Sequence, residues 1–386
     1  MTADAAAVWV GRALQAAVRS VAPPGLLDPA ARAAADALAE VWPTGQPRSW
    51  PAAALRACAV SLRQAAGDVL WSGGCHRLLL TAGYSLADAG LTGPAVAWWR
   101  ELATDSSRIL GPDHPDTLAV GSLLADALLA AGVAAEAVTW SEWVLARRVN
   151  VLGPDHRSAI AAQVSLGRAL VAGGKAGDAV RVLTEAAGHS ERVRGPDDAG
   201  TLAIGDEYAA ACVAAGQTAE AIGSCQRSLA IRERLHGPTD PATLAASLRL
   251  AAAYLAAGTF TGAIGQYEHV LATHERALGP AHPDTLAART GLAAAYDAAG
   301  QMGAALQEHQ QACTGYEGVF GAGHPDTLAR RADLARAYSA AGQLGDAVAL
   351  LRDTIARSEQ ALSPGDPLTR TLRQALADIT GEMTSQ

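Results

Sequence analysis

Apolar side chains recur every three to four positions along most of the chain, in blocks separated by glycine and proline. This spacing predicts amphipathic helices. The blocks themselves repeat: the segment LGPDHPDTL at Leu110–Leu118 has its first glycine at position 111, and related segments follow every 42 residues. They begin at Gly153, Gly195, Gly237, Gly279 and Gly321. A fixed period of this size predicts a stack of similar helical units.

Each unit has the pattern helix, tight turn, helix, loop. Pro115 and Asp116 suit a first helical turn, because proline lacks an N–H group and a carboxylate favours the positive end of a helix. We call this first helix of each unit helix A and the second helix B. Helix A is expected to end at a glycine that recurs in every unit, because glycine readily adopts the left-handed conformation of a helix end. These glycines are Gly132, Gly174, Gly216, Gly258, Gly300 and Gly342.

Large and small side chains alternate at equivalent positions of the units. A large residue on helix A is followed by a small one, as at Leu124 and Ala125 or Leu292 and Ala293. Helix B has an alanine in every unit, at positions 137, 179, 221, 263, 305 and 347. This arrangement predicts closely approaching helices with interlocking side chains in the core.

We therefore expect an all-α protein, a right-handed α-solenoid of helix pairs preceded by a small N-terminal helical domain. The N-terminal domain covers residues 1–70, with about three helices near 5–21, 28–42 and 51–66. About seven helix pairs follow at 71–362; the first lacks the loop signature and six regular ones start at 111. A single helix at 363–386 would close the stack, because its last face must be covered.

Composition narrows the possible functions. The net charge is −8 and the sequence pI about 5.7, so there is no basic footprint for nucleic acid. No apolar run reaches the ~20 residues that a membrane helix needs, and the N-terminus does not resemble a secretory signal. We expect a cytoplasmic protein without membrane contact. The five cysteines contain no CxxC pair, which favours buried thiols over disulfides or zinc ligands.

The columns of equivalent residues resemble the tetratricopeptide repeat, whose pattern appears at Leu292, Ala293, Tyr296, Gly300 and Ala305. The long period and the LGPDHPDTL loop are similar to the kinesin-light-chain type of that family. The resemblance implies a non-enzymatic scaffold for protein or peptide partners.

The N-terminal part adds a narrower resemblance. Its WP elements at Trp42–Pro43 and Trp50–Pro51, followed by the segment at 83–95, resemble the C-terminal sensor half of actinobacterial regulators of the NB-ARC or STAND type. This implies a sensor or adaptor in a bacterial regulatory system. A nucleotide-binding module is missing, since the segment around Lys175 lacks the first glycine and the Ser/Thr of a phosphate-binding loop.

Several chemical motifs have simpler explanations. The triplet His-Pro-Asp at His114, His282 and His324 recurs with the period of the array, so we interpret it as helix capping and loop geometry. No nucleophile, base or metal-ligand set converges, and we expect no catalytic site, no metal and no cofactor. A role as an enzyme or accessory protein of a metabolic or biosynthetic pathway remains the remote alternative.

Specific recognition should lie where the units differ. In repeats of this class helix A lines the concave groove, and its variable positions here are mostly polar. Asp126 and Arg168 could form an ion pair or contact a ligand, whereas Arg249, Arg289 and Arg336 could receive the carboxylates of an acidic segment. The candidate groove contacts are Asp126, Arg168, Asp206, Glu207, Arg249, Arg289, Thr290, Asp333 and Arg336.

All eight tryptophans lie at or before position 143. They could seal the N-terminal domain onto the first repeats, or Trp98, Trp140 and Trp143 could form an aromatic docking face. The second possibility supports an alternative function, an architectural scaffold that associates with itself as a homo-oligomer.

Overall fold

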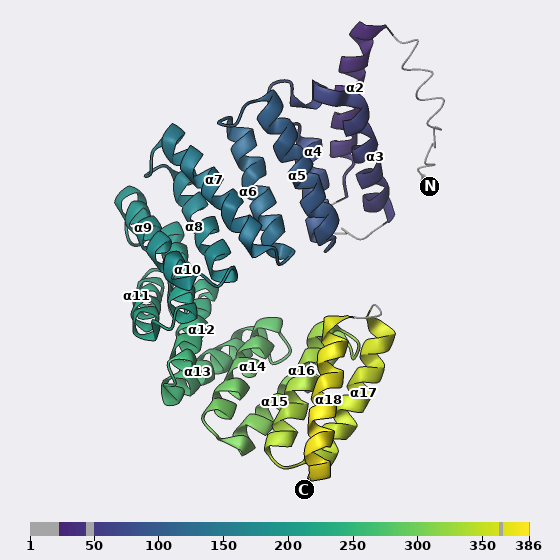
Figure 1. Cartoon of the computed structure of the whole chain (residues 1–386). Coiled ribbons are helices and arrows are strands. Elements are labelled where there is room, and N and C mark those ends of the chain that lie inside the picture. The colour runs from purple at the N-terminus through teal and green to yellow at the C-terminus, as the bar shows by residue number, and fades with distance from the viewer. Residues whose placement is uncertain (1–22, 44–49, 363–365, 386) are drawn as a thin grey trace. The chain divides into compact units, whose positions relative to one another are not determined.

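A computed structural model describes residues 23–43, 50–362 and 366–385 (Figure 1). The described residues form α-helices with one short 3₁₀ helix and contain no strand, so the expected all-α class is confirmed. The chain divides into two compact units, residues 1–193 and 194–386. Helices α2 to α9 belong to the first unit and α10 to α18 to the second.

The first unit contains α2 (Pro24–Glu40), α3 (Trp50–Ala66), the 3₁₀ helix η1 (Gly67–Trp71), α4 (Arg77–Asp88), α5 (Thr92–Ile109), α6 (Pro115–Ala130), α7 (Ala134–Leu152), α8 (Arg157–Ala172) and α9 (Ala176–Arg194). Helices A of this unit are α4, α6 and α8, and helices B are α5, α7 and α9. Consecutive helices from α4 to α8 pack against one another, and α6 also contacts α8. The expected antiparallel helix pairs are therefore present.

The second unit contains α10 (Ala199–Ala214), α11 (Thr218–His236), α12 (Pro241–Ala256), α13 (Phe260–Leu278), α14 (Pro283–Ala298), α15 (Met302–Phe320), α16 (Pro325–Ala340), α17 (Leu344–Ala361) and α18 (Pro367–Ser385). Helices A are α10, α12, α14 and α16. The last helix, α18, packs on α16 and α17, where Leu372 and Ile379 join Leu351 and Val348 in one core cluster. Helix α18 thereby buries apolar side chains of α16 and α17.

Histidine or aspartate caps the first turn of every helix A. The Nδ1 atom of His114 accepts a hydrogen bond from the backbone N–H of Asp116 at 3.1 Å, and His76, His156, His282 and His324 do the same at 3.2 Å. Asp198 and Asp240 replace histidine in α10 and α12, with carboxylate-to-N–H distances of 2.9 Å. The interpretation of His-Pro-Asp as a cap is confirmed, with the imidazole itself as the acceptor.

Glycine ends each helix A. Gly132 has φ 75°, and the equivalent glycines have φ between 70° and 76°. The N–H groups of the residues around this turn return to carbonyls of the last helical turn, as when Val133 donates to Leu128. This left-handed termination is the one expected from the sequence.

The alternating columns form the core. Leu124 and Ala125 are almost fully buried, and the helix B alanines at 137, 179, 221, 263, 305 and 347 have at most 1% of their surface exposed. A very close approach is at Gly83 in α4, where an added Cβ atom would lie 2.2 Å from Cζ2 of Trp99 in α5. Small residues thus set the distance between paired helices.

Acidic residues fix the loops of the earlier repeats to helix B. Asp113 pairs with Arg147 at 2.7 Å, and Asp197 pairs with Arg234 at 2.6 Å. Asp155 contacts both His189 at 2.6 Å and Arg192 at 2.7 Å. These contacts explain why the GPD form of the loop is accompanied by a cationic side chain near the end of helix B.

The N-terminal helices differ in part from expectation. The helix expected near 28–42 begins at Pro24 and continues through Pro29, whereas α3 closely matches the expected 51–66. Proline at position 29 lies only five residues into α2, where few intrahelical bonds are lost. The helix expected near 5–21 lies outside the described residues.

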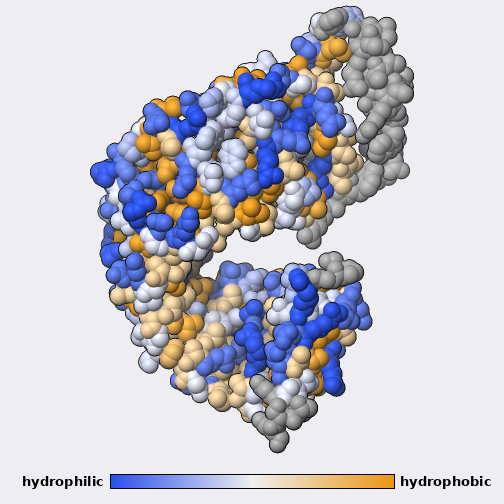
Figure 2. All heavy atoms as spheres, viewed as in Figure 1, coloured by the Kyte–Doolittle hydropathy of each residue, from blue (hydrophilic) through white to orange (hydrophobic). Residues whose placement is uncertain are grey.

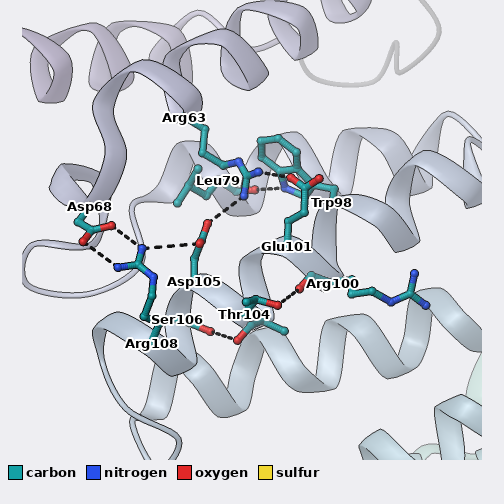
Figure 3. A network of polar contacts seen from close by, with 11 residues as sticks. Arg63, Asp68, Leu79, Trp98, Arg100, Glu101, Thr104, Asp105, Ser106 and Arg108 are labelled. Atoms are coloured by element: carbon teal, nitrogen blue, oxygen red, sulfur yellow. Dashed lines mark hydrogen bonds and ion pairs between the residues drawn. The ribbon is translucent and has the colours of Figure 1, made fainter.

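Polar contacts join α3 and η1 to α5 (Figure 3). Arg63 donates to Asp105 at 3.0 Å and to Glu101, while Arg108 forms two hydrogen bonds with Asp68 at 2.5 and 3.0 Å. The Arg63 guanidinium also lies 5.2 Å from the Trp98 ring centroid.

In the part of the chain that the structure describes, no helix is long and apolar enough to cross a membrane.

Candidate interaction surfaces

The first candidate surface lies on helices A of the second unit. On α10, Asp206 accepts hydrogen bonds from Arg232 of α11 at 2.7 and 3.2 Å and forms an ion pair with Arg249 of α12 at 3.3 Å. The Asp206 and Arg232 side chains are about one-tenth exposed, but Arg249 is 46% exposed. A buried carboxylate therefore orients an exposed guanidinium.

A second exposed arginine is held in the same way on α16. Asp333 pairs with Arg330 at 2.9 Å and also with Arg336. The Asp333 side chain is 15% exposed, whereas that of Arg336 is 71% exposed. In both places the carboxylate is paired within the protein, whereas the arginine side chain is exposed to solvent.

Helix α14 lies between these two arginines in the order of helices A and offers no long side chain at the equivalent positions, which hold Gly291 and Ala294. The ring of Tyr267 from α13 fills the space over Gly291, where an added Cβ would lie 2.3 Å from Cε1. The Thr290 hydroxyl donates to the backbone carbonyl of Leu286 at 2.9 Å, which leaves it only as an acceptor. Glu207 is half-buried on α10.

The expectation that Arg289 contacts a ligand in the groove is wrong. Its side chain is 9% exposed and lies between helices. The guanidinium donates to Glu308 of α15 at 2.7 Å, to Gln311 of the same helix, and to Glu275 of α13. Arg331, 42 residues later, is buried in the same way with Asp353, Thr354 and Glu317. These arginines tie a helix A to its two neighbours.

In the first unit, Asp126 and Arg168 occupy equivalent positions of α6 and α8, and both are exposed. The protein around the Asp126 carboxyl raises its pKa by desolvation, and the Arg168 guanidinium opposes that shift. The equivalent residue of α4 is Tyr84, which is 49% exposed and packs edge-on against Trp99 with 5.7 Å between ring centroids. Sequence reasoning missed Tyr84, although the 42-residue offset from Asp126 could have found it.

The three tryptophans expected to form a docking face, Trp98, Trp140 and Trp143, differ in exposure. Trp98 is 5% exposed, and its Nε1–H donates to the carbonyl of Leu79 at 2.9 Å (Figure 3). Trp98 therefore contributes to the seal between α3, α4 and α5 and cannot belong to a docking face, which corrects that expectation. Trp140 and Trp143 are partly exposed and form a T-shaped pair with centroids 5.4 Å apart.

The thiols are all unpaired. Cys212, Cys225 and Cys313 are buried, as expected, but Cys58 is exposed on α3. Burial and then the Asp116 carboxylate raise the pKa of Cys75 to about 12, and burial raises that of Cys225 to about 11. No group of three or more His, Cys, Asp or Glu side chains among the described residues is placed to hold a metal ion.

Comparisons with known proteins agree with the repeat architecture. Two family models described as tetratricopeptide repeat match the chain, one at residues 201–272 and 244–318 and the other at 117–158 and 327–368. Together the matches span more than half of the chain. No curated protein matches it.

Solved structures of repeat proteins also match. One is a putative kinesin light chain from Podospora anserina with nearly identical repeats, at 31% identity and TM-score 0.49, covering 53% of this chain and 97% of that one. Another is the apo form of RapI, at 11% identity and TM-score 0.52, covering 80% and 86%. A third is a STAND protein with a tetratricopeptide repeat sensor from Pyrococcus horikoshii, at 14% identity and TM-score 0.49, covering 84% of this chain and 50% of that one.

The chain belongs to the tetratricopeptide repeat family. Proteins built from these repeats generally mediate protein–protein interactions, and the fold is in general a scaffold without catalytic machinery. The residues that differ between repeats, rather than the fold, therefore determine what this member binds.

Proposed function

We propose that this protein is a sensor or adaptor of a bacterial regulatory system, located in the cytoplasm, that binds an acidic segment of a protein partner. The binding surface is the helix A face of the second unit, from α10 to α16. The observation that supports it is the pair of exposed arginines, Arg249 and Arg336, each oriented by a carboxylate that is itself mostly buried.

The chemistry of this surface favours carboxylates. A guanidinium binds a carboxylate through two parallel hydrogen bonds, and one that is already oriented loses less side-chain entropy on binding. The internal acids do not saturate the exposed arginines, because the contacts run through Nη1 of Arg249 and Nη2 of Arg336 while the two side chains stay 46% and 71% exposed. Both arginines thus keep donors directed toward solvent.

The spacing suggests an extended ligand. Neighbouring packed helices lie ~8–10 Å apart, so two helix A steps from α12 to α16 amount to about 20 Å. An extended peptide advances ~3.3 Å per residue and would cross that distance in about six residues. On the intervening helix α14 the exposed Ala294 presents only a methyl group to a peptide backbone.

A direct test uses a fluorescein-labelled peptide of alanine and serine with two glutamates about six residues apart. Fluorescence anisotropy should show binding to the full chain and a loss of about tenfold or more for Arg249→Glu combined with Arg336→Glu. The matched control is Arg276→Glu, which reverses the charge of an exposed arginine on α13, a helix B. Equal affinity of the double variant and the control would contradict the assignment.

The self-associating scaffold is the competing function. The partly exposed pair Trp140 and Trp143 is what remains to support it, since Trp98 is buried. Light scattering of the full chain over a wide concentration range separates the two: a homo-oligomer that Trp140→Ala converts to a monomer would favour the scaffold.

A further inference from the structure

The caps of helices A are unequally distributed between the two units. In the first unit α4, α6 and α8 begin with His76, His114 and His156. In the second unit α14 and α16 begin with His282 and His324. Aspartate caps the remaining helices A, α10 and α12, with Asp198 and Asp240 as acceptors, and Asp366 caps α18 in the same way.

The two kinds of cap respond differently to acid. In each histidine cap Nδ1 accepts from a backbone N–H, which requires a neutral ring with its proton on Nε2. Protonation places a second N–H against that backbone N–H and adds a positive charge at the positive end of the helix. An aspartate cap keeps its acceptor at all but strongly acidic pH.

We propose that the histidine caps make the first unit acid-sensitive, so that its helix A starts open when the imidazoles are protonated while the aspartate-capped helices stay closed. Every helix A of the first unit that the structure describes depends on a neutral imidazole. In the second unit, three of the five capped helices do not.

Carboxylates close to the histidine rings also affect whether the rings can cap the helices. Asp36 of α2 lies 3.3 Å from Nε2 of His76, and Asp116, Asp284 and Asp326 lie 4.0, 3.7 and 3.6 Å from Nδ1 of the histidine two residues earlier. These carboxylates are alternative partners for the rings, but a ring that turns to bind one of them no longer accepts from the backbone. Protonation therefore removes the cap in either orientation.

Other charges near the caps are already paired. Asp113, in the loop before His114, binds Arg147 of α7, and Asp155, before His156, binds His189 and Arg192 of α9. Arg148 of α7 donates to the carbonyl of Ser158. Phe320 of α15 stacks on the His324 ring at 5.0 Å between centroids. His189 and His309 also contact carboxylates, those of Asp155 and Asp297, so a global melting curve alone would not isolate the effect of the caps.

Hydrogen–deuterium exchange of the full chain resolves individual helix starts. After correction for intrinsic rates, a change from about pH 7.5 to about pH 5.5 should speed exchange at the starts of α4, α6, α8, α14 and α16 by about fivefold relative to those of α10, α12 and α18. A factor of five corresponds to the loss of a cap worth about 1 kcal/mol. Equal changes at histidine-capped and aspartate-capped starts would overturn the proposal.

Reciprocal substitutions provide the second measurement. His114→Asp and His156→Asp should abolish the acid response at the starts of α6 and α8, and Asp240→His should create one at α12. Because all eight tryptophans lie within residues 9–143, their fluorescence reports on the first unit alone. In thermal melts followed by this fluorescence, the double variant His114→Asp, His156→Asp should lose less stability in acid than the unmodified chain; identical pH dependence would count against the caps as the cause.

Discussion

The hydroxyl of Tyr296 on α14 donates a hydrogen bond of 2.7 Å to the carboxylate of Glu268 on α13, 28 residues earlier. The same 28-residue offset joins Tyr254 to Gln226 at 2.9 Å and Tyr338 to Gln310 at 3.1 Å. These contacts connect the helix B of one repeat to the helix A of the next in three successive repeats. Only the Tyr296 contact involves a charged acceptor.

The Tyr296 phenol should therefore ionise late. The hydrogen bond to Glu268, together with desolvation and the negative charge of that carboxylate, raises the pKa of Tyr296 to about 12. Because this value exceeds that of an unfolded tyrosine, about 10, the contact stabilises the fold fully below pH 10 and is lost as the pH rises toward 12. A titration of labelled tyrosine Cζ resonances should show Glu268→Gln lowering the pKa, whereas Tyr338→Phe should leave it unchanged.

Removal of the Arg289 side chain should destabilise the second unit strongly. Arg289→Ala leaves the carboxylates of Glu275 and Glu308 without their shared guanidinium, and breaking a buried ion pair in this way costs about 3–5 kcal/mol. Arg276→Ala, on an exposed face of α13, should change the free energy of unfolding by less than about 0.5 kcal/mol. Denaturant unfolding measures both, and similar effects would show that Arg289 is not an internal clamp.

Gly83 should not tolerate a side chain. In Gly83→Ala the new methyl group would overlap Trp99, and overpacking of this kind costs about 1–3 kcal/mol. Gly265→Ala in α13 is the matched control, because nothing lies within 4 Å of its added Cβ and alanine favours a helix by about 0.5–1 kcal/mol. Thermal unfolding should move in opposite directions for the two variants.

The cysteines should differ widely in reactivity. Cys58 is exposed, whereas burial and Asp116 hold the pKa of Cys75 near 12 and so keep it a neutral thiol. Brief treatment of the folded protein with iodoacetamide near pH 8 should modify Cys58 first, as judged by peptide mass spectrometry. Rapid labelling of Cys75 or Cys225 would contradict the predicted order.

The sequence was sufficient for the repeat architecture because the period places chemically equivalent residues at equivalent points. The glycine that ends each helix A and the large–small column at Leu124 and Ala125 depend only on local conformation and on contacts with the neighbouring unit. The glycine recurs at the end of every helix A, and the large–small column recurs in every helix A from α6 onward. The N-terminal start of α2 was missed because that segment has no repeated counterpart with which to compare it.

The candidate surfaces were harder to predict because exposure changes within one residue along a helix. Thr290 and Arg289 are adjacent, yet successive residues point about 100° apart and Arg289 points into the interface. The column that contains Arg289 also holds Gly121, Gln163, Gly205, Ser247 and Arg331, and this mixture of small and long side chains does not by itself indicate burial. Arg232, which orients Asp206, was missed because it lies on helix B, where only tryptophans were considered as contacts for a partner.

The uniform joints between repeats bear on how such a chain can change length. Every helix A begins after a histidine or aspartate cap and ends at the same glycine turn, so an in-frame gain or loss of 42 residues at any loop would rejoin structurally equivalent ends. Contacts that are particular to one repeat, such as Asp206 with Arg249, would be broken or duplicated by such an event. Recombination could thus alter the number of helix pairs without changing how the remaining pairs fold, and it would change which side chains are available to a partner.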